Sequence, residues 1–159
     1  MEFRKIVKNF TSAVENNDGE KLASLFTVDG IYDDYIYGEF KGRRDIASML
    51  PTHFHRDAKN FSWEMYDLLN NESKGYARYR FSFTSTLTGS ENLKVAVPGM
   101  AYFQFDGNLI EYYGEVVNGG IPMAQLNLPA GKIKRVFEKW SDRALDSDSK
   151  LKKLYTKGE

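Results

Sequence analysis

The stretch YARYRFSFTSTL, residues 76–87, decides the fold class of this chain. One face of this segment, if extended, carries Ala77, Tyr79, Phe81, Phe83 and Leu87, and the other carries Arg78, Arg80, Ser82, Thr84 and Thr86. Such alternation is typical of a long β-strand with one face on a core and one face open. The strand therefore belongs to a sheet that is covered on one side.

The segments around this strand extend it into a meander. The expected strands are 61–69, 76–87, 93–105 and 109–117. Polar residues at 70–75 and Asp106-Gly107-Asn108 predict tight hairpin turns. Pro98-Gly99, in the middle of the third of these strands, predicts a bulge or bend. Because short turns join successive strands, we expect them to pair antiparallel.

Helical patterns dominate the N-terminal part of the chain. The amphipathic spacing of Phe3, Ile6, Val7, Phe10 and Val14 predicts a first helix, which Asn16–Gly19 ends. The expected elements that follow are a short helix with Leu22, Leu25 and Phe26 inward, a turn at 28–30, a β-rich run at 31–37, a loop at 38–42 and a helix at 43–50 that Pro51 ends.

The C-terminal part is again helical. Ile133, Val136, Phe137, Trp140 and Ala144 predict an amphipathic helix after Pro129. The charged tail 146–159 is expected to fray. We therefore predict an α+β domain at residues 1–120, with residues 121–159 as a helical extension packed on the same domain.

Composition limits the classes of partner. The 159 residues carry 22 Lys and Arg and 22 Asp and Glu, so neither nucleic acid nor a membrane is expected as a partner. Cysteine is absent and the N-terminus shows no apolar signal region, which favours a cytoplasmic setting. Aromatic residues make up 14% of the chain, so many large rings need a core, a pocket or an interface.

Three stretches resemble the superfamily of nuclear transport factor 2, ketosteroid isomerase and the SnoaL-like polyketide cyclases. They are the N-terminal helix pair that ends in Leu25-Phe26, the run Ile31–Ile46, and the hairpin Phe103–Glu115. The resemblance covers about residues 1–120. It implies a cone-shaped, cystatin-like α+β barrel, in which a curved antiparallel sheet wraps around the N-terminal helices and encloses an aromatic-lined pocket. It also implies a homodimer.

Glu115 is the first candidate for a catalytic residue. Strand alternation puts Glu115 on one face with Leu109, Glu111, Tyr113 and Val117. In cyclase-like and epoxide-hydrolase-like members of the superfamily a carboxylate follows an Ile by five positions on this strand, as Glu115 follows Ile110. A carboxylate in an apolar cone has a raised pKa and can act as a general acid or base. The alternative is a solvated or salt-bridged strand residue.

Asp33 and Asp34 form the second candidate pair. They are consecutive on a strand, so only one of them can point into the cone. The resemblance to ketosteroid isomerases favours Asp33, nine residues before Gly42, whereas a loop one residue different in length selects Asp34. The Tyr and protonated Asp that complete a ketosteroid isomerase site have no visible counterpart, so we do not expect that specific activity.

His53 is a further candidate acid or base, and His55 lies two residues away. A metal site would need a third ligand. The chain has no third histidine and offers only Asp57 nearby, so we do not expect a metal site. The ten tyrosines suggest surfaces that are apolar yet hydrated. The expected ligand-binding residues are Tyr32, Tyr35, Trp63, Tyr79, Phe81, Tyr102 and Tyr113.

These observations favour a protein that binds a small hydrophobic, polyketide-like molecule. Its chemistry would be cyclisation, isomerisation or dehydration by carboxylate acid–base catalysis, without a cofactor. The alternative is a non-catalytic ligand-binding or protein-interaction module of the same fold. A deep cavity around an unpaired carboxylate would favour the enzyme, and an interior filled by Tyr and Phe side chains would favour the module.

Overall fold

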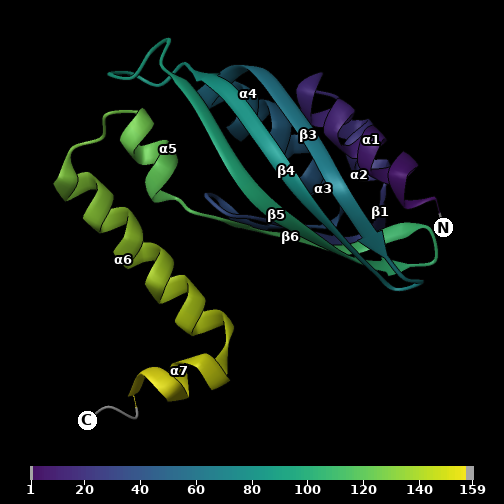
Figure 1. The fold of residues 1–159 in the computed structure, drawn as a ribbon. Coiled ribbons are helices and arrows are strands. Elements are labelled where there is room, and N and C mark those ends of the chain that lie inside the picture. The colour runs from purple at the N-terminus through teal and green to yellow at the C-terminus, as the bar shows by residue number, and fades with distance from the viewer. Residues whose placement is uncertain (1, 157–159) are drawn as a thin grey trace. The chain divides into compact units, whose positions relative to one another are not determined.

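The computed structural model describes residues 2–156 and divides the chain into two compact units, Met1–Leu126 and Asn127–Glu159 (Figure 1). The helices of the first unit are α1 (Phe3–Glu15), α2 (Gly19–Ser24), α3 (Gly42–Met49), the π-helical turn η1 (Leu50–Phe54), α4 (His55–Asp57) and α5 (Gly120–Gln125). Its strands are β1 (Phe26–Asp34), β2 (Gly38–Lys41), β3 (Ala58–Asn70), β4 (Lys74–Ser85), β5 (Lys94–Asp106) and β6 (Leu109–Val117).

The six strands form one curved, open sheet in the order β2-β1-β6-β5-β4-β3. The expected α+β class and the antiparallel meander from β3 to β6 are confirmed. Helices α1 to α3 cover one face of the sheet (Figure 1). Strand β1, which contains Ile31, lies at the edge of this meander, where it pairs parallel with β6, and β2 pairs with its other side.

The region around β1 differs most from the expectation. The segment predicted as a turn, Val28-Asp29-Gly30, is part of β1. Glycine serves here for a close approach to strand β6, since a Cβ on Gly30 would lie 2.9 Å from the carbonyl oxygen of Ile110. The true turn is at 35–37, where Asp34 Oδ1 accepts hydrogen bonds from the N–H groups of Ile36 and Tyr37. The segment expected as a loop at 38–42 is largely strand β2.

Pro51 and Pro98 are the two prolines at which the sequence predicts a break in an element. Helix α3 ends at Met49, next to the predicted end at Leu50, and Pro51 lies in the first positions of the π-helical turn η1 that follows. Pro98-Gly99 is not a bulge, since β5 pairs regularly with β4 there. The irregularity lies instead between Gln104 and Phe105. It leaves Glu111 unpaired and turns Ile110 into the core, against the predicted parity.

The core of the first unit is unusually rich in aromatic rings. Phe10 of α1 is fully buried and contacts five other rings at centroid distances of 4.7 to 6.3 Å. These rings belong to Phe26, Tyr32, Trp63, Phe103 and Tyr113. The helix and four strands are thus held together around one side chain.

The second unit consists of α6 (Ala130–Ser147) and α7 (Ser149–Thr156). Helix α6 follows Pro129 and carries the predicted apolar stripe. The tail that was expected to fray is helical up to Thr156, and residues 157–159 lie outside the described part. That this extension packs on the cone domain stays a prediction. Among residues 2–156, no helix is long and apolar enough to cross a membrane.

Candidate functional site

The carboxylate of Glu115 lies on the helix-covered side of the sheet and is held by three donors. Oε2 accepts hydrogen bonds from the hydroxyls of Tyr79, at 2.8 Å, and Tyr113, at 3.1 Å. Oε1 accepts one from the backbone N–H of Tyr35, at 3.3 Å. The donors come from β4, from β6 itself and from the turn after β1, so the fold of the cone positions this carboxylate.

Burial raises the pKa of Glu115 above the ordinary value of a glutamate. The hydrogen bonds from Tyr79, from the Tyr35 N–H and from Tyr113 favour the charged form and oppose this shift, whereas the charge of Asp33 adds to it. Burial and then the charge of Glu115 raise the pKa of Tyr79 and of Tyr113. Both phenols therefore stay protonated, and both can donate to the carboxylate.

Gly99 allows Tyr79 to reach Glu115. The two residues Gly99 and Tyr79 are partners across the β4–β5 pairing. A Cβ on Gly99 would collide with Cζ and with the hydroxyl oxygen of Tyr79. The tyrosine ring thus lies directly over the glycine. The Pro98-Gly99 pair, which predicted a bulge, marks this close approach instead.

Two buried polar groups near Glu115 have no hydrogen-bond partner, namely the hydroxyl of Tyr32 and the indole N–H of Trp63. Their side chains are 0% and 5% exposed. The Tyr32 hydroxyl is close enough to Tyr113 for the two to influence each other's pKa, but it makes no hydrogen bond of ordinary geometry. Since an unpaired buried donor costs about 1–3 kcal/mol, such groups call for an explanation.

The structure separates the two aspartates of β1. Asp34 lies on the inner face with Tyr32 and is 5% exposed. Asp33 points to the other face, where it accepts a 2.6 Å hydrogen bond from the hydroxyl of Tyr112. Asp34 is therefore the aspartate on the same face of the sheet as Tyr32. Its Oδ1 already caps the turn at 35–37.

The two histidines lie in different surroundings. The ring of His53 packs edge-on against Tyr37 and Phe40, and its Nδ1 is 2.9 Å from the hydroxyl of Thr52. The Nε2 of His55 is 2.8 Å from the carbonyl oxygen of Val14, which fixes that ring against helix α1. Neither ring is among the hydrogen-bond partners of Glu115 in the described residues.

The expected ligand-binding rings fall into two groups. Tyr32, Trp63, Tyr79 and Tyr113 are buried around Glu115, and the half-buried Phe81 packs on Trp63 at 4.8 Å. The other two rings lie elsewhere. Tyr102 stacks on Tyr112 at 5.3 Å on the outer face of the sheet, and the Tyr35 hydroxyl accepts a hydrogen bond from the Gly119 N–H. Tyr102 is therefore not placed to touch a ligand at Glu115.

Helix α5, which follows β6, was not expected from the sequence. Its Gln125 side chain pairs with both backbone groups of Ala96, at 2.9 and 3.1 Å, and so continues the β5 ladder beyond the end of β6. Met123 and Leu126 are buried. The sequence before Pro129 shows no apolar periodicity that reveals this helix.

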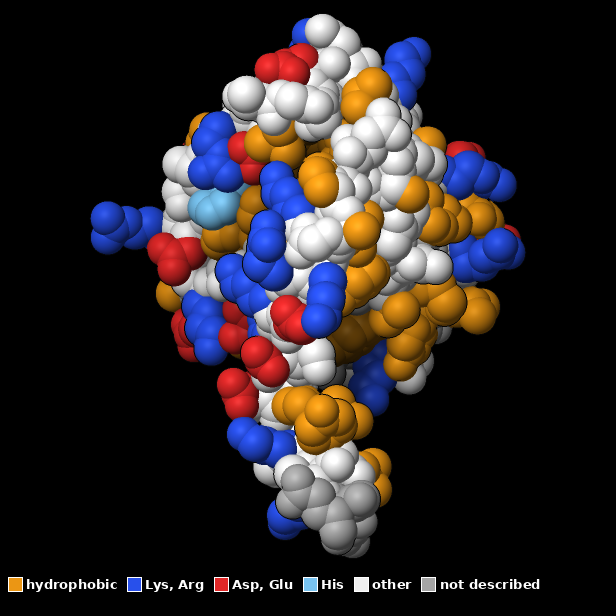
Figure 2. Space-filling model, turned by 90° about the vertical axis from the view of Figure 1, so that its left-hand side faces the viewer, with side chains coloured by type: hydrophobic (Ala, Val, Ile, Leu, Met, Phe, Trp, Pro, Cys, Tyr) orange, Lys and Arg blue, Asp and Glu red, His pale blue; other side chains and the backbone are white. Residues whose placement is uncertain are grey.

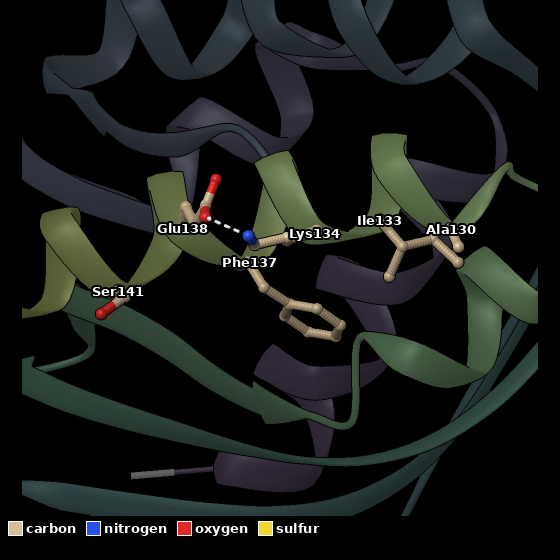
Figure 3. Close-up of a pocket in the computed structure, with 6 residues that line it drawn as sticks. All are labelled: Ala130, Ile133, Lys134, Phe137, Glu138 and Ser141. Carbon is tan, nitrogen blue, oxygen red and sulfur yellow. Dashed lines mark ion pairs between the residues drawn. The ribbon is translucent and has the colours of Figure 1, made fainter.

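A shallow depression lies in the second unit and is shown in Figure 3. All of the residues that line it come from helix α6: Ala130, Ile133, Lys134, Phe137, Glu138 and Ser141. Lys134 and Glu138 form an ion pair at 3.5 Å beside the ring of Phe137. One face of a single helix cannot enclose a small molecule, so the carboxylate site of the cone is the better candidate.

Comparison with protein families matches residues 7–113 to the SnoaL-like domain. This match spans more than half of the chain and includes most of the first helix, the first three of the long strands and most of the last hairpin. The chain belongs to the SnoaL-like family, as the sequence resemblance predicted. Comparison with curated proteins finds none that matches.

Solved structures agree with the family. A protein of ketosteroid isomerase-like fold from Catenulispora acidiphila, in complex with trimethylamine, has a TM-score of 0.71 at 20% identity, over 80% of this chain and 95% of that chain. A protein from Shewanella putrefaciens described as a SnoaL-like polyketide cyclase has a TM-score of 0.68 at 15% identity, over 81% and 98%. An epoxide hydrolase from M. tuberculosis has a TM-score of 0.63 at 15% identity, over 77% and 86%. At these identities the likeness shows the fold.

Proposed function

We propose that the protein binds a small, largely apolar molecule at Glu115 and exchanges a proton with it, as a cofactor-independent isomerase, cyclase or dehydratase does. The observation that carries this proposal is the carboxylate of Glu115, which is held inside the cone by two phenols and has a raised pKa. Groups with such perturbed pKa values cluster at catalytic sites. The similarity to polyketide cyclases and an epoxide hydrolase supports a family that acts on small molecules.

The unpartnered donors of Tyr32 and Trp63 support a ligand with a polar end. A carbonyl oxygen close to these groups would accept the hydrogen bonds that the protein itself leaves unmade. The surrounding rings would contact the apolar body of the molecule. The ligand class is therefore an apolar carbonyl compound.

A non-catalytic ligand-binding module is the second candidate, because aromatic side chains fill the interior. Phe10, Tyr32 and Tyr113 are fully buried, and their ring centroids are 4.6 to 5.7 Å apart. An interior filled by Tyr and Phe side chains is the arrangement expected for the non-catalytic module. The raised pKa of Glu115 favours the enzyme.

The test uses 2-tetralone, an apolar ketone with exchangeable protons next to its carbonyl. We expect the protein to bind it, seen as a change in Trp63 fluorescence in a Trp140→Phe background. We also expect NMR in D₂O to show faster loss of the α-protons than in buffer. Binding without faster exchange would favour the non-catalytic module. If 2-tetralone neither binds nor exchanges its α-protons faster, the proposed ligand class is wrong.

We further propose a homodimer formed through the outer face of the sheet. Met100 and Val116 are partners across β5 and β6, and their side chains are 52% and 70% exposed. Exposed hydrophobic side chains also lie among interspersed charges on the surface drawn in Figure 2. Arg78 and Arg80, whose guanidinium groups lie over the ring of Tyr66, supply polar side chains for the edge of such an interface.

Sedimentation at high micromolar concentration should therefore show a dimer, whose interface buries at least about 1,000 Å². Val116→Glu should shift the equilibrium toward the monomer, because it places a charge in the centre of the buried area. A monomeric wild-type protein at that concentration would contradict the proposal.

A further inference from the structure

The two units of the chain carry opposite net charge. Residues 1–126 contain 13 Lys and Arg and 17 Asp and Glu, whereas residues 127–159 contain 9 and 5. The balanced charge of the whole chain is therefore the sum of an acidic cone and a basic C-terminal unit. Such an asymmetry is typical of chains that bind nucleic acid or a membrane. The expectation that excluded both partners used the whole chain and does not apply to this unit alone.

Helix α6 carries an apolar stripe that remains on the surface. Its members recur at helical spacing: Ile133, Val136, Phe137, Trp140 and Ala144. None of them is buried, and the ring of Phe137 is 41% exposed. Ile133 and Phe137 project from the same side of the helix, where they line the shallow depression (Figure 3). The stripe therefore offers an apolar surface to a partner.

The charges of α6 are sorted around this stripe. Basic side chains recur at i, i+7 and i+11 and so follow one line along its border: Lys132, Lys139 and Arg143. Acidic side chains recur at i, i+4 and i+8 on the side opposite to the stripe: Glu138, Asp142 and Asp146. A helix that lies in the surface of an anionic bilayer needs this arrangement. Its apolar side chains enter between the lipids, its basic side chains reach the phosphates, and its acidic side chains stay in water.

Helix α7 repeats the pattern. Its large apolar side chains, Leu151, Leu154 and Tyr155, are 41%, 70% and 72% exposed. Three lysines lie among them, and the helix sequence contains no acidic residue. The lower end of the view in Figure 2, where α7 lies, shows hydrophobic side chains with Lys or Arg next to them.

The two helices are separate elements, because the backbone of Asp148 between them is extended. A groove on a protein partner typically accepts one continuous amphipathic helix. Two successive helices with the same apolar and basic pattern fit a flat, extended partner better. A basic amphipathic helix with Trp and Phe on its apolar side is typical of helices that lie on a membrane.

We propose that α6 and α7 bind the surface of an anionic lipid bilayer. Both helices lie in the plane of the surface, with the stripe of α6 and the apolar side chains of α7 between the lipid chains. Trp140 and Tyr155 are residue types that favour this depth. The proposal goes beyond ligand binding at Glu115 and does not depend on it.

The test mixes the full chain with vesicles of phosphatidylcholine and phosphatidylglycerol, and with vesicles of phosphatidylcholine alone. We expect the protein to float with the anionic vesicles only, and high salt should weaken this binding. Phosphatidylcholine with brominated chains should quench tryptophan fluorescence in the anionic vesicles. Trp140→Phe should remove the quenching, because Trp63 is 5% exposed inside the cone and lies out of reach of the lipid chains.

A matched pair of variants tests the sorting of charge. Lys132→Gln changes the border of the stripe, and Arg135→Gln changes the side that carries the acidic residues. Both positions are exposed, and each substitution removes one positive charge. Lys132→Gln should weaken binding to anionic vesicles by about fivefold, and Arg135→Gln by no more than about twofold. Phe137→Glu should abolish binding, since it places a charge in the stripe.

Three results would overturn the proposal: no flotation with anionic vesicles, flotation without quenching of Trp140, or an equal loss in the two charge variants. Equal flotation with phosphatidylcholine alone would contradict the role of the basic border. If the vesicles do not bind the protein and Phe137→Glu converts a sedimenting dimer into a monomer, a second copy of the chain covers the stripe instead.

Discussion

Glu115→Gln should slow the exchange of the 2-tetralone α-protons by about 10²- to 10⁴-fold and leave the protein folded. Glutamine has the shape of glutamate, and its side-chain oxygen can still accept a hydrogen bond from Tyr79 or Tyr113. It cannot give or take a proton at neutral pH. The loss should therefore appear in the rate of exchange, while the affinity for 2-tetralone changes little.

The matched control is Glu111→Gln on the same strand. Glu111 is exposed and lies at the irregularity between β5 and β6, outside the ring cluster. Its substitution removes the same charge and should leave both binding and exchange unchanged. Exchange at the wild-type rate in Glu115→Gln would contradict a proton-transfer role for this residue.

The pH dependence of stability separates this role from a structural one. Because burial raises the pKa of Glu115, the folded protein binds this proton more tightly than the unfolded chain does. The stability from this group is fully present below the unfolded pKa, and it is lost as pH rises through the higher folded pKa. The amide introduced by Glu115→Gln does not titrate, so the variant should gain stability relative to wild type across that window. A salt-bridged glutamate would show the opposite trend.

The fold was predictable because its strands alternate cleanly over long runs. The alternation of residues 76–87 and the turn at Asp106-Gly107-Asn108 fix the antiparallel meander, and the structure agrees. The parallel pairing of β1 with β6 was not predictable, because it joins segments about eighty residues apart that no turn connects. Alternation also missed the unpaired Glu111, since one inserted residue changes the parity without changing the composition.

The candidate site was predictable in part. Strand parity counted from Tyr113 puts Glu115 inside the cone, and the structure places it there. The choice between Asp33 and Asp34 depended on the exact end of β1, which the sequence pattern does not define. The role of Gly99 could not be found either, because a glycine beneath a ring and a glycine in a bulge look alike in a sequence.

Phe10→Ala should lower the free energy of unfolding of the cone by about 3–5 kcal/mol. Phe10 is 0% exposed, so the substitution removes a ring that contacts five others. These neighbours come from β1, β3, β5 and β6, and backbone pairing prevents the strands from closing the cavity. The cost therefore includes both the lost burial and the empty space. Denaturant unfolding, followed by Trp63 fluorescence in a Trp140→Phe background, measures it.

The matched control is Phe137→Ala on helix α6, which removes the same ring from a side chain that is 41% exposed. That substitution should change the free energy of unfolding of the cone by no more than about 0.5 kcal/mol. Because Tyr32 and Tyr113 pack directly on Phe10, its loss should also loosen the phenols around Glu115. A Phe10→Ala protein as stable as the Phe137→Ala control would show that the ring cluster does not hold the cone together.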